Sequence, residues 1–283
     1  MAEANCPCCG KGGAAHWCDS GGFKIMRCGC GVSYPVAVPP NTAPSDAEIN
    51  EIYNKNEASG VQDYLEIEGD NKKDFESRLD FIISYIGGAG TLLDIGCNIG
   101  SLLDVAQRRG WRVEGVDINK TAVKIAKERG LKCRSGDFSK IGKKFDLIVM
   151  NDVLEHLPNP NRGLRCASKL LKSGGHIYIS TPDSGSAVAR LARGRWIHMK
   201  PREHLCIFTK GAILRLLEEE GFEILRLSAV GRTRSAGLVI RKMKSCAGIF
   251  GALELLPRFA KGMKLHINLS DEMQLIARKK KRA

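Results

Sequence analysis

From residue 91 onward, short apolar runs alternate with segments in which apolar residues recur at every third or fourth position. The short runs predict strands, and the other segments predict amphipathic helices, one of which Asn119 is suited to cap. Strands that alternate with helices indicate a parallel sheet that helices cover on both faces. We therefore expect an α/β fold with a Rossmann-like, doubly wound sheet. The predicted strands are residues 91–95, 112–117, 145–150 and 176–180.

The chain before residue 91 follows a different pattern. Four prolines between Val32 and Ser45 exclude a regular helix or a central strand and predict a linker. Asp46 is suited to cap a helix that includes Tyr53, and the apolar positions from Phe75 to Ile86 predict a further amphipathic helix. The expected organisation is a cysteine-rich module over residues 1–38, a linker with helices over 39–90, and an α/β domain over 91–283.

The last third of the chain carries the whole charge excess. The 283 residues include 44 Lys+Arg and 31 Asp+Glu, which gives a net charge of +13. Residues 187–283 hold 21 basic and 8 acidic groups, which is the same excess, so the preceding part is balanced. Residues 232–265 mix apolar and basic side chains and predict a helical cap. Such a cap covers a substrate site with a solvated outer face, or it lies on an anionic bilayer or shelters a lipid-like acceptor.

Composition limits the class of protein. With 43% hydrophobic and 27% charged residues, the chain suits one or two folded domains with a buried core. Its apolar runs are shorter than the ~18–20 residues of a membrane-spanning helix. The first residues also lack the basic start and apolar centre of a signal peptide. We therefore expect a cytoplasmic protein, with peripheral membrane contact through the basic third as an alternative.

Six of the 11 cysteines lie in the first 30 residues. Cys6 and Cys9 belong to one short turn, Cys28 and Cys30 belong to a second, and a glycine follows each turn. In a chain without an export signal, such a cluster favours a metal site over disulfides. Four thiolates from two turns suit a structural zinc ion, and the segment resembles a zinc ribbon. The second turn is one residue short, so a segment that has lost its metal stays open, as do other ligands: Cys8, Cys18 and His16.

A polar turn follows the first predicted strand. It reads Asp94-Ile95-Gly96-Cys97-Asn98-Ile99-Gly100, and Asp117 ends the next strand. Parallel sheets bind ligands at the carboxyl ends of their strands, where an acid can accept both hydroxyls of a ribose. A dinucleotide fingerprint would need glycine at positions 98 and 101, which hold asparagine and serine. The glycines present leave room for a ligand beside the backbone, and asparagine tolerates a left-handed conformation.

This turn fits Asp-x-Gly-x-(Gly/Asn)-x-Gly, the first motif of class I S-adenosylmethionine-dependent methyltransferases, which the chain resembles. Further motifs follow in order: Gly136-Asp137-Phe138, and then Asn151 to Leu157, which contains the Glu-His-Leu signature of the ubiquinone-pathway O-methyltransferases. The resemblance implies a seven-stranded sheet whose last strand is antiparallel, and S-adenosylmethionine as cofactor. The cofactor-binding residues that it implies are Asp94, Gly96, Asn98, Gly100, Asp117, Ile118, Asp137, Phe138 and Asn151.

The implied residues divide according to the parts of the cofactor. Without a cofactor, they would form an ordinary tight turn of a parallel sheet, and Asp137 would only cap a turn. The resemblance implies that Asp94, Gly96 and Asn151 hold the methionine end, Asp117 the ribose, and Asp137 with Phe138 the adenine.

Two histidines are candidate catalytic residues. Methyl transfer is an in-line displacement that depends mostly on alignment, and a base is needed only to remove the proton of a hydroxyl acceptor. In the topology that the resemblance implies, His156 faces the transferred methyl group, and its unperturbed pKa is close to neutrality. The alternative is that it stabilises the start of a helix. His204 lies in the segment expected to cover the substrate, as a base or a hydrogen-bond partner.

These observations predict an enzyme that methylates an oxygen, rather than a carbon or nitrogen, of a small acceptor, with lipid-linked and anionic compounds as candidates. An RNA methyltransferase is the first alternative. The Asn/Asp-Pro-Pro-aromatic motif of exocyclic-amine methylation is missing after the strand predicted at 145–150, however, where the chain reads Asn151-Asp152-Val153-Leu154, and the basic third has no run of aromatics for base stacking. The second alternative is a non-catalytic protein that binds the cofactor or zinc.

Overall fold

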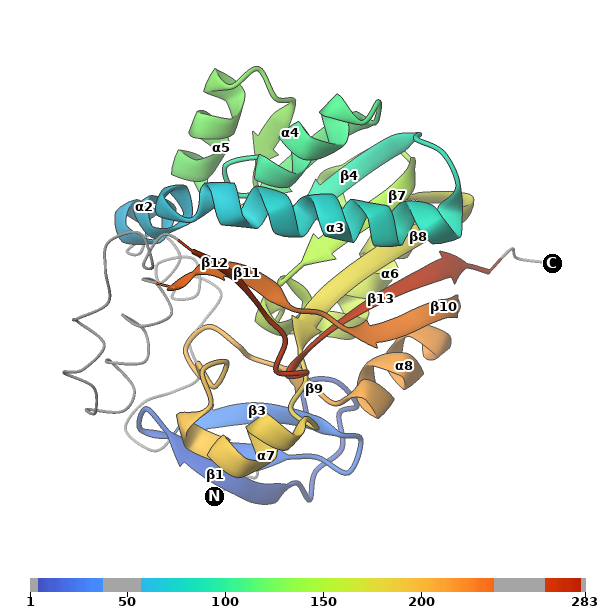
Figure 1. The fold of residues 1–283 in the computed structure, drawn as a ribbon. Helices are drawn as coiled ribbons and strands as arrows, with labels where there is room; N and C mark the ends of the chain where they lie inside the picture. Colours follow the sequence, from blue (N-terminus) through green and yellow to red (C-terminus); the bar gives the residue numbers. More distant parts are fainter. Residues whose placement is uncertain (1–4, 38–56, 237–262, 281–283) are drawn as a thin grey trace.

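The computed structural model describes residues 5–37, 57–236 and 263–280. Figure 1 shows a large twisted sheet with helices on both faces and a smaller sheet of N-terminal strands at one end of it. The large sheet has the strand order β10-β13-β8-β7-β4-β5-β6. Its strands are β4 Thr91–Ile95, β5 Arg112–Asp117, β6 Cys133–Ser135, β7 Phe145–Asn151, β8 Leu171–Pro182, β10 Phe222–Ala229 and β13 Glu272–Lys279.

The strand directions agree with the prediction. Neighbouring strands from β8 to β6 are parallel, whereas β13 is antiparallel to both β8 and β10. The seven-stranded, doubly wound sheet with an antiparallel last strand is therefore confirmed. The strands predicted at 91–95 and 112–117 have the predicted bounds, and β7 extends one residue further.

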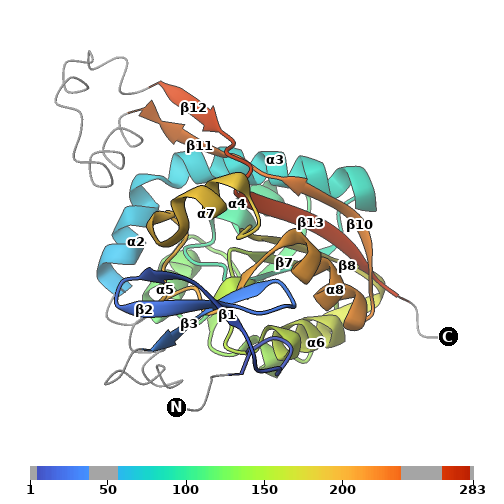
Figure 2. The ribbon, with the colours of Figure 1, turned by 90° about the horizontal axis from the view of Figure 1, so that it is seen from below.

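Helices cover both faces of this sheet, as Figures 1 and 2 show. Alternate residues of β4 face opposite sides of the sheet: Leu92 belongs to the same buried cluster as Leu79 of α3, while the adjacent Leu93 belongs to the cluster that includes Leu216 of α8. Burying side chains of this size stabilises the fold by about 1.5–3 kcal/mol each. The helices are α2 Glu57–Glu66, α3 Glu68–Ile86, α4 Ser101–Arg108, α5 Lys120–Glu128, α6 Pro160–Leu170, α7 Ala187–Ala192 and α8 Lys210–Glu219, with 3₁₀ turns η1 Phe138–Lys140, η2 Leu154–His156 and η3 Arg193–Arg195.

The small sheet joins the N-terminal module to the α/β domain. Its order is β1-β2-β3-β9, with β1 Ala15–Ser20, β2 Phe23–Arg27, β3 Val32–Ala37 and β9 Ile207–Phe208. The linker predicted from Val32 is wrong over residues 32–37, which form β3. Pro35 is tolerated because β9 pairs only with Val32 and Ser33, so β3 is an edge strand where the proline lies.

The two ends of the segment predicted as a helical cap are strands that pair with each other. β11 Arg232–Ser235 pairs with β12 Lys264–Ile267 in antiparallel register, so the prediction is wrong at these ends. Two buried acids of α3 contact this strand pair. Asp74 accepts hydrogen bonds from the backbone N–H of Thr233 and from the guanidinium group of Arg234, and Asp70 forms an ion pair with Lys264. The remainder of the predicted cap, Tyr53, Cys246 and the helix predicted from Asp46 lie outside the described residues.

Within the described part of the chain, the helices are too short or too polar to cross a membrane.

Candidate active site

The turn after β4 has the backbone that its sequence predicts. Gly96, Asn98 and Gly100 all have positive φ, of +79°, +46° and +83°, so the left-handed conformation expected at Asn98 is confirmed. A Cβ atom at Gly96 would lie 2.4 Å from Cγ2 of Val153, so position 96 has no room for a side chain. The turn leads directly into α4, for which Gly100 is the N-cap residue.

Asp117 holds this turn against the end of β5. One carboxylate oxygen accepts the backbone N–H of Asn98 and the other that of Asn119, both at 2.8 Å. Burial raises the pKa of Asp117, and these N–H groups act against that rise. A carboxylate offers about four lone-pair positions, so Asp117 retains acceptor capacity for the hydroxyls of a ligand.

Asp94 lies deeper in the sheet and is 3% exposed. Burial raises its pKa well above the ordinary value, and the neighbouring Cys133 and Asp117 add to the rise. A ligand cation nearby would favour the ionised carboxylate. Asp94 is therefore suited to accept a positively charged group at the carboxyl end of β4.

The residues assigned to adenine, Asp137 and Phe138, follow β6. β6 lies beside β5, and the N–H of Gly136 donates to the carbonyl of Asp117 at 2.9 Å. Asp137 is exposed and caps η1, because its carboxylate accepts the N–H and the hydroxyl of Ser139 at 2.8 and 2.6 Å. Those hydrogen bonds lower its pKa. Ile118 is exposed and Phe138 half-buried, so the rim of this end offers apolar surface.

Arg78 of α3 is a site residue that the sequence did not reveal. Its side chain is 2% exposed, and Nη1 donates to Oδ1 of Asn151 at the end of β7. Among the described residues, Nε and Nη2 of Arg78 have no hydrogen-bond partner. Buried polar groups are nearly always paired, and guanidinium groups prefer carboxylates. Arg78 is therefore suited to bind a carboxylate that belongs to a ligand.

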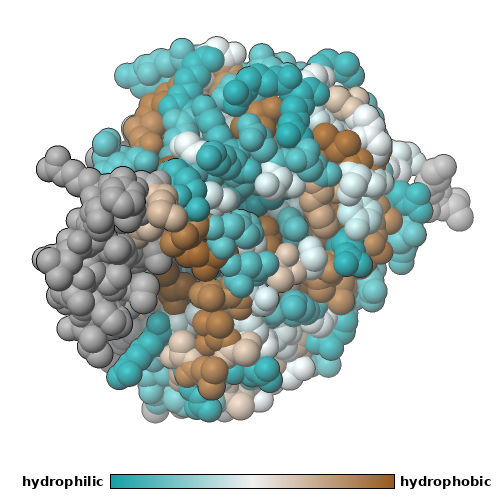
Figure 3. Space-filling model, in the orientation of Figure 1, coloured by the Kyte–Doolittle hydropathy of each residue, from teal (hydrophilic) through white to brown (hydrophobic). Residues whose placement is uncertain are grey.

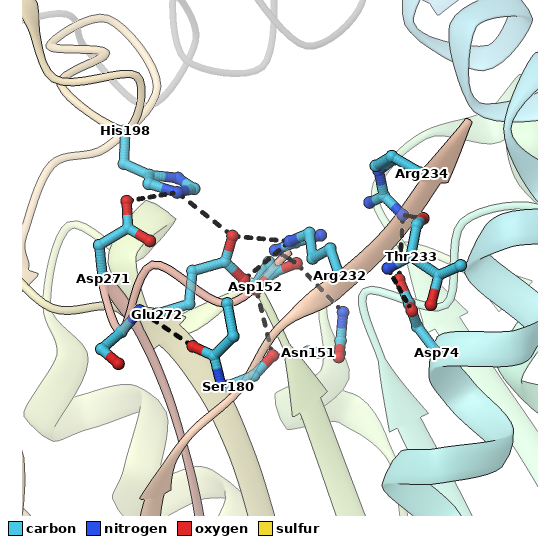
Figure 4. Close-up of polar contacts among 12 residues, drawn as sticks. Asp74, Asn151, Asp152, Ser180, His198, Arg232, Thr233, Arg234, Asp271 and Glu272 are labelled. Atoms are coloured by element: carbon cyan, nitrogen blue, oxygen red, sulfur yellow. Dashed lines mark hydrogen bonds and ion pairs between the residues drawn. The ribbon is translucent and has the colours of Figure 1, made fainter. Parts of the chain in front are cut away.

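A partly buried network of charges borders Asn151 (Figure 4). Asp152 has φ +55° and pairs with Arg232, which also donates Nε to both carboxylate oxygens of Glu272. Burial would raise the pKa of Glu272, but the charge of Arg232 outweighs it and holds the pKa well below its usual range. His198 continues the network, with Nε2 at 3.2 Å from Glu272 and 3.8 Å from Asp271. Arg232 is therefore already matched by two acids.

His156 and His204, the predicted catalytic residues, come together beside this network. Their rings are edge-to-face at 4.9 Å. Nδ1 of His156 lies 2.8 Å from the carbonyl of Glu203, and Nδ1 of His204 lies 2.7 Å from the carbonyl of His198. A carbonyl only accepts, so each Nδ1 carries the proton and each Nε2 is the basic nitrogen. Below, we call these two residues the histidine pair.

Burial controls protonation in this part of the site. It lowers the pKa of His156, and it lowers that of His204 to about 3. Burial and the charge of Asp152 raise the pKa of Glu155 to about 8. Near neutral pH both imidazoles are uncharged and Glu155 holds a proton. Ligand atoms of Glu155 and the histidine pair lie within 4.8 Å of one another, a donor set that also suits a divalent cation.

The four predicted zinc ligands also come together. The Sγ atoms of Cys6, Cys9, Cys28 and Cys30 all lie within 4.8 Å of one another, with Cys6–Cys30 at 3.6 Å and Cys9–Cys28 at 3.5 Å. A tetrahedral zinc with Zn–S bonds of about 2.3 Å would place its sulfurs about 3.8 Å apart. We call these residues the thiol cluster. The donor set and its spacing fit zinc.

The alternative ligands lie elsewhere or play other roles. His16 is exposed beside Asp19, and Cys18 is buried in a separate cluster with Ile25. Cys8 stays outside the group of four, and burial raises its pKa to about 12. The other described cysteines are partly or fully buried, as expected for small core residues: Cys97, Cys133, Cys166 and Cys206.

Comparisons with known proteins agree with this geometry. A family model described as "Methyltransferase domain" matches residues 60–227. The chain is similar to a ubiquinone biosynthesis O-methyltransferase from Alkalilimnicola ehrlichii, with 28% identity over 59% of this chain and 68% of the relative. The corresponding protein from Nitrosomonas europaea is 29% identical over 57% of this chain and 70% of the relative.

Solved structures share the fold. The 1,6-didemethyltoxoflavin-N1-methyltransferase of Burkholderia thailandensis has a TM-score of 0.55 and 17% identity, and the match covers 94% of this chain and 98% of that one. Magnesium protoporphyrin IX methyltransferase from Synechocystis, solved with bound S-adenosylhomocysteine, also has a TM-score of 0.55 and 17% identity, over 81% and 98% of the two chains. At such identities the similarity establishes the fold alone.

Proposed function

Because the chain belongs to the family of S-adenosylmethionine-dependent methyltransferases, we propose that it transfers a methyl group to an oxygen atom of a small acceptor. The observation that carries the proposal is the Asp117 carboxylate, which two backbone N–H groups orient beside the glycine turn. An acceptor oxygen is favoured over carbon or nitrogen because the site holds an uncharged imidazole, His156, that could accept the proton of a hydroxyl group. The O-methyltransferase names of the relatives support the same choice.

The ligand-free side chains divide the cofactor site into three parts. Asp117 would accept the ribose hydroxyls, and Asp137 with Phe138 and Ile118 would enclose the adenine. Asp94 would face the ammonium group of the methionine end, where the buried carboxyl gains a cation as partner. Arg78 would receive the methionine carboxylate on Nε and Nη2, which have no partner among the described residues, and its bond to Asn151 would hold it in place.

The histidine pair would carry the proton transfer. When bound, S-adenosylmethionine supplies a methyl group on a positively charged sulfur. The acceptor hydroxyl forms a C–O bond as the S–C bond breaks, and its proton must pass to a base. His156 is the better base, since a pKa of about 3 makes His204 weakly basic. His204 would hold the acceptor hydroxyl through a hydrogen bond and align it for in-line attack.

The thiol cluster would hold a structural zinc ion. All four ligands are cysteines, which leaves no open coordination position for catalysis. The backbone N–H groups of Lys11 and Val32 face the sulfurs of Cys9 and Cys30, and such contacts stabilise thiolates.

The acceptor would be small and partly apolar. Hydrophobic side chains gather on one face over α7 and the segment after it, where Leu191 is 86% exposed and Ile197 is also exposed (Figure 3). Exposed apolar patches often mark binding sites for ligands or membranes. An anionic group would need a basic partner other than Arg232, which two acids already match. A lipid-linked acceptor at a membrane surface would suit the exposed apolar side chains and would not require Arg232 as a partner.

Isothermal titration with S-adenosylhomocysteine tests the cofactor site. We expect binding to the wild-type chain and strongly reduced binding to Asp117→Ala, with Glu114→Ala on the same strand as the control. No binding to the wild type, or equal binding to Asp117→Ala, would refute the proposal. The acceptor can then be sought by incubating cell extract with radiolabelled cofactor and separating lipid, polysaccharide and RNA fractions. Label in the lipid fraction is expected, and label in RNA alone would contradict the acceptor class.

A further inference from the structure

The thiol cluster and the histidine pair are connected by one short segment. Resting on the proposed function, we infer that the metal-loaded thiol cluster positions the histidine pair, so that the metal controls the acceptor side of the site and not cofactor binding. The two groups lie far apart in the sequence, and the connection is made by residues 203–209.

The thiol cluster holds one side of this segment. β9 continues the sheet of the N-terminal module, with Val32 opposite Phe208 and Ser33 opposite Ile207. Next to β9, the N–H of Thr209 donates to the carbonyl of Gly31 at 3.1 Å. These contacts begin one residue after Cys30, so the metal-binding turn fixes the position of β9.

A second contact reaches the same turn from α8. The guanidinium group of Arg215 donates to the carbonyl of Cys30 itself. α8 follows β9 directly in the chain, so the C-terminal part of the segment and the helix after it both contact the second cysteine turn.

Cys206 links the cluster to the histidines by packing. Its side chain is fully buried in the same core as Cys6, Cys28 and Phe208, although it is not one of the four ligands. His204 is only two residues away. A change in the volume or position of the cysteine turns therefore reaches the backbone that carries His204, because close-packed interiors transmit displacement.

The other side of the segment holds the histidine pair. The N–H groups of Leu205 and Cys206 donate to the carbonyl of Glu155 at 2.8 and 3.0 Å, which fixes η2 and with it His156. The carbonyl of Glu203 accepts Nδ1 of His156 at 2.8 Å. One backbone segment therefore carries His204 and orients the imidazole of His156, and its C-terminal part pairs with the metal module.

The cofactor half of the site rests on different contacts. Asn98 and Asn119 donate to Asp117, and Gly96 donates to the carbonyl of Val116 at 2.8 Å. These bonds join β4, β5 and α5, which are covered by α3 and α4 on the other side of the sheet from the thiol cluster. Loss of the metal should therefore leave this half in place.

The experiment separates the two halves in the full-length chain. Zinc content is measured in wild type, in Cys9→Ser and in Cys166→Ser, a control at a cysteine of α6 outside the cluster. Histidine ring signals are recorded by ¹⁵N NMR, and binding of S-adenosylhomocysteine by calorimetry. In Cys9→Ser we expect loss of zinc, shifted or broadened signals from the histidine pair, an unchanged signal from His176 on β8, and a dissociation constant within about twofold of wild type. Cys166→Ser should match wild type throughout.

Several results would overturn the inference. These are a wild-type chain that binds no zinc, unchanged signals from the histidine pair after zinc is lost, or cofactor binding lost together with zinc. In the last case, the cluster would support the whole domain. If Cys9→Ser does not fold, Arg215→Ala keeps all four ligands but removes the bond to Cys30, and it should shift the same histidine signals. A wild type that binds zinc but no S-adenosylhomocysteine would refute the proposed function, while the ring signals would still decide this inference.

Discussion

Replacing Arg78 with methionine should move stability and ligand binding in opposite directions. Arg78 is 2% exposed, and in the described structure two of its nitrogens lack partners. A buried, unsatisfied polar group costs about 1–3 kcal/mol. Methionine keeps much of the length of the side chain without the charge, so the ligand-free Arg78→Met protein should be at least as stable as wild type.

Binding should respond in the other direction. Hydrogen bonds to charged groups contribute about 1.5–3 kcal/mol, so loss of the contact to the methionine carboxylate should weaken S-adenosylhomocysteine binding by about 10- to 150-fold. Calorimetry measures the affinity, and urea unfolding of the ligand-free chain measures the stability. Arg108→Met, on the exposed face of α4, is the control and should change neither quantity by much. Wild-type affinity in Arg78→Met, or destabilisation of its ligand-free form by more than about 2 kcal/mol, would refute the reasoning.

Three further predictions concern Asp117, Glu155 and Arg232. Asp117→Ala should weaken S-adenosylhomocysteine binding at least about tenfold in calorimetry, because it loses both the ribose acceptor and the restraint on Asn98; equal affinity would contradict this. Glu155 has a pKa raised from 4.5 to about 8, so protonation favours the folded state and wild type should lose stability relative to Glu155→Gln as the pH rises through this window. A stability difference that is constant with pH in urea unfolding would exclude this. Arg232→Met should destabilise the chain by about 3–5 kcal/mol because Asp152 and Glu272 lose their partner, whereas Arg278→Met, in an exposed pair with Glu223, should cost less than about 1 kcal/mol. An equal loss of stability in Arg232→Met and Arg278→Met would contradict the stabilising role assigned to the ion pairs of Arg232.

The sequence predicts the elements whose signal is local. The strands at 91–95 and 112–117 have their predicted bounds because a short apolar run between polar turns is sufficient to define a buried strand. Asn119 accepts the N–H of Ala122, as the predicted cap requires. The left-handed turn at Asn98 was likewise predictable, because glycine and asparagine have few other reasons to stand in this pattern.

What the sequence missed depends on partners that are distant in the chain. β9 has two residues and no periodicity, so its pairing with Val32 and Ser33 leaves no trace in the local pattern. Arg78 is on a helix that the apolar positions from Phe75 to Ile86 predict, and a single arginine in such a helix is typical of its solvated face. Only the three-dimensional structure reveals that it is buried.

The charge count shows the same limit. The excess of basic groups in the last third suggests an anionic partner when it is counted along the chain. In the structure, Arg232, Arg234 and Lys264 instead pair with acids from earlier elements. Counting cannot detect such pairs because Asp152, Asp74 and Asp70 lie 80, 160 and 194 residues away from their basic partners.

The position of β13 also constrains how the protein is made. This strand forms from residues 272–279, yet it lies between β8 and β10 inside the sheet. During synthesis, one edge of β8 therefore stays unpaired until β13 has left the ribosome. β10 cannot join the sheet before then either, because in the described structure it pairs only with β13. Removing only this short stretch would leave the nascent chain with a permanently open edge, the kind of surface on which unfinished chains aggregate and which chaperones cover.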